Sequence, residues 1–128
     1  MKDSLKNIKH NRSVIYLCKF ENNVIGFFAL SADAIKINAK IEINYPVYPA
    51  IKIGRLAVDK KYSGKRIGSI LIDWIIGICF SLRKSARIRF LSVDAYPKSI
   101  GFYEKNFFKK LKSNPENLIP MYKDLNEK

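Results

Sequence analysis

A glycine-bearing basic loop in the middle of the chain has the residue types best suited to chemistry. It runs from Asp59 to Ser69, after an apolar strand-like segment at 53–58 and before an apolar helix-like segment at 67–82. The first N–H groups of a helix have no partner within the helix, and the helix dipole favours an anion at that end. Lys65 and Arg66 add positive charge there. The spacing therefore predicts a turn that binds a diphosphate.

Two familiar phosphate loops do not fit these residues. A P-loop needs Lys-Ser or Lys-Thr directly after its second glycine, whereas Gly68 is followed by Ser69 and Ile70. A dinucleotide fingerprint needs three glycines at fixed spacing, and the loop contains only Gly64 and Gly68. Taken alone, the loop leaves open a second interpretation, a basic strand–helix turn without a ligand.

Hydrophobic periodicity predicts the elements that position this loop. The expected strands are 14–20, 24–31, 51–58, 89–95, 107–112 and 118–125, with a half-exposed strand or extended segment at 35–43. The expected helices are 67–82, apolar on most faces and therefore buried, and 97–106. We expect loops at 44–50, which contains two prolines, at 83–87 and at 114–117, and a polar leader at 1–11. This order indicates an α+β or α/β fold in a single domain spanning 1–128.

Composition argues against several other kinds of site. With His10 as the only histidine, neither a histidine-based triad nor a multi-histidine metal site can be built, and we expect no metal. Cys18 and Cys79 lack ligand spacing and are interpreted as buried, reduced thiols. The longest apolar run, 70–82, is shorter than the roughly 20 residues that span a bilayer. The leader has no apolar export signal, so we expect a cytoplasmic protein without a membrane partner.

The charge of the chain is strongly positive. There are 24 Lys and Arg residues against 11 Asp and Glu, a net charge of +13, and the surplus is concentrated between Ile51 and Phe90. Clustered basic residues favour a polyanion because binding to phosphates releases counterions. An AT-rich genome, which raises the lysine content of its proteins, would explain the same surplus. Charge alone therefore leaves nucleic-acid binding open.

The stretch from Arg55 to Ile72 resembles the acetyl-CoA motif of the GNAT superfamily of N-acetyltransferases, Gln/Arg-x-x-Gly-x-Gly/Ala. Ser63 stands at the first position of that motif, Arg66 at its first glycine and Gly68 at its second. The resemblance implies acetyl-CoA as co-substrate and a central mixed, mostly antiparallel twisted sheet flanked by helices. It implies that Leu56 and Val58 offer main-chain groups to the pantetheine arm, with Ala57 between them also in the cofactor site. It further implies that the diphosphate is held by Ser63, Gly64, Lys65, Arg66, Ile67, Gly68 and Ser69.

A second motif follows in the expected order. The segments Leu91–Ala95 and Ile100–Phe108 are similar to the next strand of the family and to its signature Asn-x-x-Ala-x-x-Phe/Leu-Tyr-x-x-x-Gly-Phe. Phe102, Tyr103 and Phe108 match the signature, whereas the places of Asn, Ala and Gly are taken by Tyr96, Ser99 and Phe107. The two motifs together extend the resemblance over roughly residues 14–125.

Tyr103 is the candidate catalytic residue. Amide formation from a thioester expels a thiolate whose acid has a pKa of about 8.5, and a tyrosine that is protonated at neutral pH can supply its proton. The alternative is a core tyrosine packed by Phe102, Phe107 and Phe108. A main-chain N–H within 56–58 is the candidate donor to the thioester oxygen. Asp59 and Asp94 are possible bases, but both are equally explained as a turn residue and a strand-end cap.

The acceptor is suggested by a narrower resemblance. Toxins of type II toxin-antitoxin modules that acetylate the α-amine of aminoacyl-tRNA are similar in the segments Gly26–Ser31, Tyr45–Ala50, Ile53–Asp59 and Val93–Ala95. This implies tRNA, a ribbon-helix-helix antitoxin and a second copy of the chain as partners. The N-terminal helical segment of those toxins is short or missing here. Small-molecule or protein-amine acetylation remains an alternative, as does a non-catalytic nucleic-acid-binding domain.

The basic connection after the long helix is the candidate tRNA contact. It contains Arg83, Lys84 and Arg87, which we expect to lie away from the diphosphate loop. A solvated connection without a partner explains the same residues equally well.

Overall fold

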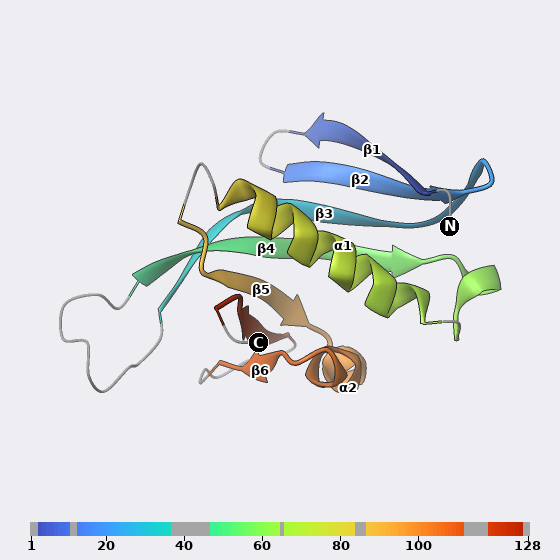
Figure 1. Cartoon of the computed structure of the whole chain (residues 1–128). Helices are drawn as coiled ribbons and strands as arrows, with labels where there is room; N and C mark the ends of the chain where they lie inside the picture. Colours follow the sequence, from blue (N-terminus) through green and yellow to red (C-terminus); the bar gives the residue numbers. More distant parts are fainter. Residues whose placement is uncertain are drawn as a thin grey trace.

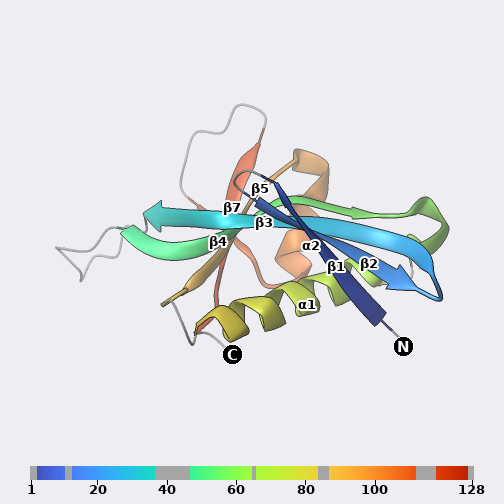
Figure 2. The same ribbon diagram turned by 90° about the horizontal axis from the view of Figure 1, so that it is seen from above.

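The computed structural model describes residues 3–10, as backbone, together with 13–36, 47–64, 66–83, 87–111 and 118–126. These residues form a seven-stranded sheet with the order β1-β2-β3-β4-β5-β7-β6. All neighbouring strands are antiparallel except β4 and β5. A long helix, α1, lies across one face of the sheet, and a short helix, α2, lies beyond the end of β5 (Figures 1 and 2). The predicted mixed, mostly antiparallel GNAT-like sheet flanked by helices is thereby confirmed.

The first half of the chain is an antiparallel meander. It consists of β1 (Asp3–His10), β2 (Ser13–Phe20), β3 (Asn23–Lys36) and β4 (Val47–Val58). The hairpin between β2 and β3 turns through Glu21 and Asn22, which both have positive φ, 49° and 66°. Two such residues match the twist of the flanking strands, so the predicted hairpin is confirmed.

The structure differs from the sequence analysis of this half at two places. No strand was predicted within the polar leader at 1–11, yet β1 pairs with β2 along its whole length. Its apolar residues, Leu5 and Ile8, lie three apart and give no period of two, so only the pairing reveals the strand. The predicted loop at 44–50 is also partly strand, because β4 starts at Val47; 44–46 lie outside the described residues.

β4 accommodates Pro49 because the N–H that proline lacks would point to the β5 side. The Pro49 carbonyl accepts a hydrogen bond from the Arg89 N–H on the β5 side, and N–H and C=O of one strand residue point the same way. β5 pairs with β4 only from Ala50 onward, so no ladder bond is lost. Of the strand predicted at 35–43, the structure describes residues 35 and 36, which end β3.

The second half supplies both helices. It contains a 3-10 turn η1 (Lys60–Tyr62), α1 (Ile67–Leu82), β5 (Phe90–Ala95), a second 3-10 turn η2 (Pro97–Ser99), α2 (Ile100–Lys105), β6 (Lys109–Lys110) and β7 (Ile119–Asp124). The bounds predicted for α1 are confirmed, and the helix predicted at 97–106 corresponds to η2 and α2. The loop predicted at 114–117 lies outside the described residues. Within the described part of the chain, no helix is long and apolar enough to cross a membrane.

The main core lies between α1 and the sheet. The helix contributes Leu71, Ile72, Ile75 and Cys79, whereas Phe80 and Leu82 are exposed, so the helix predicted as buried leaves one face to solvent. An apolar sequence can still leave one helix face exposed when only one sheet packs against it. Cys18 and Cys79 form no disulfide and are buried members of this core, as predicted. Burial raises the pKa of Cys79 to about 11, which keeps the thiol neutral.

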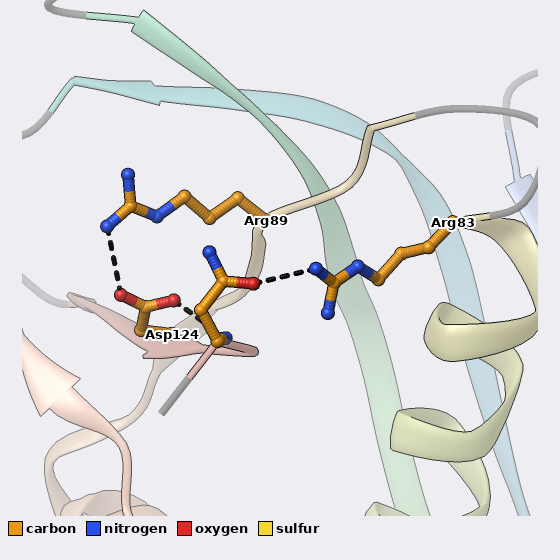
Figure 3. Close-up of polar contacts among 4 residues, drawn as sticks. Arg83, Arg89 and Asp124 are labelled. Carbon is orange, nitrogen blue, oxygen red and sulfur yellow. Dashed lines mark hydrogen bonds and ion pairs between the residues drawn. The ribbon is translucent and has the colours of Figure 1, made fainter. Parts of the chain in front are cut away.

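Two arginines form hydrogen bonds with Asp124 and Asn126, near the C-terminal end of the described chain (Figure 3). Arg89 donates to the Asp124 carboxylate at 3.3 Å, and its guanidinium lies 5.1 Å and 5.0 Å from the ring centres of Tyr48 and Phe90. Arg83 donates to Asn126 Oδ1 at 2.7 Å and lies over the ring of Phe80. Both arginines therefore have partners within the molecule.

The close approach of β3, β4 and α1 at Gly26 predicts a specific loss of stability. A Cβ at this residue would lie 2.6 Å from the Ala57 carbonyl oxygen and 3.1 Å from a methyl group of Leu71. Because the oxygen belongs to a paired strand, Gly26→Ala should lower the free energy of unfolding by about 1–3 kcal/mol in urea denaturation.

Gly77→Ala is the matched control. Gly77 is exposed in α1, a Cβ there meets nothing within 4 Å, and alanine favours the helix by about 1 kcal/mol. This variant should be as stable as the parent or more so. A Gly26→Ala protein with parental stability would show that β4 can move away from β3.

Candidate active site

The separation of β4 from β5 creates a cleft. The two parallel strands pair only over Ala50–Ile53 with Phe90–Val93, and the remainder of β4 has no partner on that side. A cavity of about 370 Å³ lies where they separate. It is lined by Phe27, Ile53, Gly54, Arg55, Leu56, Ala57, Val93, Asp94, Ala95, Tyr96, Ser99 and Tyr103.

A bulge at Gly54 accompanies this separation. Ala29 pairs with Arg55 and Leu30 pairs with Ile53, so Gly54 is an extra residue without a partner in β3. A bulge bends its strand and increases the local twist, which turns the end of β4 away from β5. Sequence analysis missed it, although a glycine inside a strand is a recognised sign of a bulge.

The bent end of β4 directs main-chain groups into the cleft. The Asp59 N–H donates to the Ile25 carbonyl at 2.8 Å, toward β3. Main-chain groups alternate in direction along an antiparallel strand, so Ala57 also points to β3, whereas Leu56 and Val58 point to the open side. The main-chain groups of Leu56 and Val58 thus face the side away from β3, whereas Ala57 lines the cleft without directing its main chain into it.

The first turn of α1 forms an anion-binding end beside the cleft. Its first intrahelical bond runs from the Ile70 N–H to the Arg66 carbonyl, so the N–H groups of Ile67, Gly68 and Ser69 have no partner within the helix. No side chain caps this end. The free N–H groups and the positive end of the helix dipole suit a diphosphate.

The loop before this turn contains two residues with positive φ, Gly64 at 79° and Arg66 at 60°. The left-handed conformation at Arg66 explains why the family motif has glycine at this position. Ser63 donates its hydroxyl to the Lys60 carbonyl at 2.9 Å and closes the η1 turn. Lys65 lies outside the described residues.

Gly68 brings α2 into contact with α1. A Cβ on Gly68 would lie 3.0 Å from the ring of Phe102, so the missing side chain makes room for that ring. Asn106 at the end of α2 donates to Ser69 Oγ at 3.3 Å. The first turn of α1 and the helix that contains Tyr103 are therefore held together.

Tyr103 lines the cleft from α2. It is buried, and its ring packs edge-to-face against Phe102 and Phe108 with centroids 5.1 Å and 5.3 Å apart. Burial raises the pKa of Tyr103 to about 12, so the phenol is neutral and available as a hydrogen-bond donor. Phe107, expected in the core alternative as a packing partner of Tyr103, is 77% exposed, so that part of the prediction was wrong.

The two carboxylates considered as bases have partners. Asp59 accepts a hydrogen bond from the Lys61 N–H at 2.9 Å, which is the turn role considered for it. Asp94 lines the cleft and forms an ion pair with Lys52, Nζ to Oδ2, at 2.6 Å. Both carboxylates are therefore already engaged in contacts within the molecule, and we assign no general base.

A second cavity reaches the cleft from the other face of the sheet. It has a volume of about 390 Å³ and shares Phe27, Gly54 and Arg55 with the first cavity. Its remaining lining residues are Ser13, Ile15 and Ala29. Phe28 and Leu30 pack in the core under α1, so Phe27 and Ala29 point to the opposite face. The two cavities thus meet at Phe27, Gly54 and Arg55, a junction that sequence analysis did not foresee.

Comparison with known proteins identifies the class. Residues 1–107 match the Acetyltransferase (GNAT) family, and the chain belongs to that family. It is a GNAT acetyltransferase, an enzyme class that uses acetyl-CoA.

Within this class the chain is similar to toxins. It is 29% identical to the tRNA-acetylating toxin of Mycobacterium tuberculosis, over 96% of this chain and 77% of the relative. The structure of AtaT complexed with acetyl-methionyl-tRNAfMet superimposes with a TM-score of 0.73 and 24% identity, over 84% of this chain and 69% of AtaT. An AtaT variant bound to the C-terminus of the antitoxin AtaR and acetyl-CoA gives a TM-score of 0.69 and 24% identity, over 84% of this chain and 65% of that chain.

The contact between Gly68 and Phe102 predicts how the anion-binding turn can be disturbed. Gly68→Val would force the first turn of α1 away from the ring. The free energy of unfolding should fall by about 1–3 kcal/mol, and calorimetry should show weaker acetyl-CoA binding.

A double-mutant cycle supplies the control. In a Phe102→Ala background, which removes the ring, Gly68→Val should cost less in both measurements. Gly101→Val is the matched substitution in α2, where a Cβ meets nothing within 4 Å. The Gly101→Val protein should bind acetyl-CoA with near-parental affinity. Equal losses with and without the Phe102 ring would contradict the contact as the cause.

Proposed function

We propose that this acetyltransferase transfers the acetyl group of acetyl-CoA to the α-amine of aminoacyl-tRNA. The observation that carries the proposal is the junction of two cavities at Gly54 and Arg55. One cavity is lined by Tyr103 of α2, the helix that packs on the anion-binding end of α1, and suits the thioester. The other is lined by residues of β2, β3 and β4 on the far face and suits the amine. The similarity to the tRNA-acetylating toxin and to AtaT supports tRNA as the acceptor.

The residues divide the binding of acetyl-CoA between them. The N–H groups of Ile67, Gly68 and Ser69 hold the diphosphate, with Ser63, Gly64, Lys65 and Arg66 completing the loop. Main-chain groups of Leu56 and Val58 hold the pantetheine arm, as a strand would be held by its neighbour. The Leu56 N–H is the candidate donor to the thioester oxygen. This arrangement puts the sulfur at the side of the cleft lined by Tyr103.

Tyr103 acts on the leaving group. As the amide C–N bond forms and the C–S bond breaks, its hydroxyl donates a hydrogen bond to the sulfur. A phenol with a pKa of about 12 is a weaker acid than a thiol with a pKa of about 8.5. Tyr103 therefore gives its own proton to the sulfur only as it receives the proton that the amine loses. Its hydroxyl is restored at the end of the step. One proton leaves nitrogen and one reaches sulfur, so the reaction balances.

The acceptor amine needs little help from a base. An α-amine with a pKa of about 7.7 is on the order of 10 to 20% neutral at pH 7. The ion pair of Asp94 with Lys52 is compatible with this, because neither carboxylate considered as a base has to take up the proton.

Basic residues at the open face would meet the tRNA. Arg55 is exposed and lines both cavities, so it lies where the end of a bound tRNA would enter. Arg87 is exposed and stays a candidate tRNA contact, whereas Arg83 has intramolecular partners and Lys84 lies outside the described residues. By analogy with AtaT and AtaR we further propose an antitoxin, of the ribbon-helix-helix type, and a homodimer.

The acceptor is tested by competition among amines. The protein is incubated with radiolabelled acetyl-CoA and total aminoacyl-tRNA, beside polyamines, aminoglycosides and peptide N-termini. We expect label on the aminoacyl-tRNA and a steep loss of tRNA binding with added salt, since each neutralised phosphate releases counterion. Label only on small amines or peptides would exclude tRNA and leave acetyl transfer standing.

Removing the Tyr103 hydroxyl tests the proposed donor. Tyr103→Phe should lower kcat by roughly 10²-fold, the usual scale for a proton donor, with acetyl-CoA affinity unchanged in calorimetry. The fold should survive because the ring contacts with Phe102 and Phe108 remain. Near-parental turnover would show that the Tyr103 hydroxyl is not needed for catalysis and that the residue has a structural role only.

A further inference from the structure

Phe107 combines two unfavourable features. Its φ is 72°, in the left-handed region that bulky residues rarely adopt, and its side chain is 77% exposed. Glycine would relax this conformation, and the family signature has glycine at this position. The ring gains little from burial, so packing does not explain it. A strained residue that packing does not explain suggests a functional contact.

The position of Phe107 connects it to the acetyl-CoA site. Asn106, the preceding residue, donates to Ser69 Oγ at 3.3 Å and to the Phe102 carbonyl at 2.9 Å. Ser69 belongs to the first turn of α1, and Phe102 packs against Gly68 in the same turn. Phe107 therefore follows directly after the contact that joins α2 to the diphosphate-binding turn.

The surroundings of the ring suit a nucleotide. The Lys123 ammonium lies 5.0 Å from the ring centre on one face, and the high exposure leaves the other face open. Lys105 and Lys110, close by in the sequence, are exposed as well. An open aromatic face beside ammonium groups is the combination that stacks a base and attracts its phosphates.

We propose that Phe107 is the platform on which the adenine of acetyl-CoA stacks. The thioester end of the molecule occupies the cleft beyond the first turn of α1, so its nucleotide end must leave the diphosphate site on the outer side, where α2 ends. The purine lies on the open face of Phe107, and Lys123 supports the opposite face. This inference rests on the proposed acetyl-CoA site and is independent of the acceptor.

Two ligands and two variants separate this role from a structural one. The ligands are acetyl-CoA and S-acetyl-4′-phosphopantetheine, which lacks the adenosine, and binding is measured by calorimetry. Phe107→Gly should bind acetyl-CoA roughly 5- to 100-fold more weakly, the range for loss of one stacked base. Its affinity for the truncated ligand should not change. Phe107→Tyr keeps the ring and should keep parental affinity for both ligands.

Stability gives a second readout. Phe107→Gly relaxes the positive φ, so its melting temperature should rise while its acetyl-CoA affinity falls. Unchanged acetyl-CoA affinity would overturn the proposal; if the same variant then fails to self-associate in ultracentrifugation, the ring serves a second copy instead. Equal weakening for both ligands would also overturn it, since the diphosphate turn would then be disturbed. A parent protein that binds neither ligand would refute the acetyl-CoA site itself, an outcome distinct from these.

Discussion

The separation of β4 from β5 is the constraint on which the rest of the site depends. Parallel pairing stops at Ile53 and Val93, and the unpaired Gly54 bends β4 at that point. Without the bend, the main-chain groups of Leu56 and Val58 would be used in the ladder with β5. The same bend joins the two cavities, because Gly54 and Arg55 line both. A single local irregularity thus provides both the cleft proposed for the thioester and its connection to the second cavity.

Contact between α1 and α2 imposes a second condition. The ring of Phe102 occupies the space left by Gly68, and Asn106 bonds to Ser69. These contacts fix the distance between the N–H groups proposed to hold the diphosphate and the hydroxyl of Tyr103. The proposed binding turn and the proposed proton donor are consequently coupled through packing, so that substitutions in α2 affect the first turn of α1. The burial that positions Tyr103 also raises its pKa and keeps it neutral.

Net charge overstates the basic surface available to a nucleic acid. Lys52 pairs with Asp94, Arg89 with Asp124 and Arg83 with Asn126. These side chains stabilise the acceptor face and the end of the chain, and an intramolecular partner reduces what each contributes to an RNA interface. Arg55 and Arg87, which are exposed, are better placed to meet an anionic partner. The position of a charge therefore matters more here than the total of +13.

The sequence by itself determined the α1 bounds, the β2–β3 hairpin, the loop before the helix and the two motifs of the family, because these depend on local periodicity and turn residues. Tertiary structure decided the rest. β1 exists through pairing with β2, since its own residues do not alternate. β4 passes through Pro49 because the missing N–H would point to the β5 side, where pairing starts only at Ala50. The bulge at Gly54, the fit of Phe102 on Gly68 and the exposure of Phe107 depend on neighbours distant in the sequence, which no local pattern encodes.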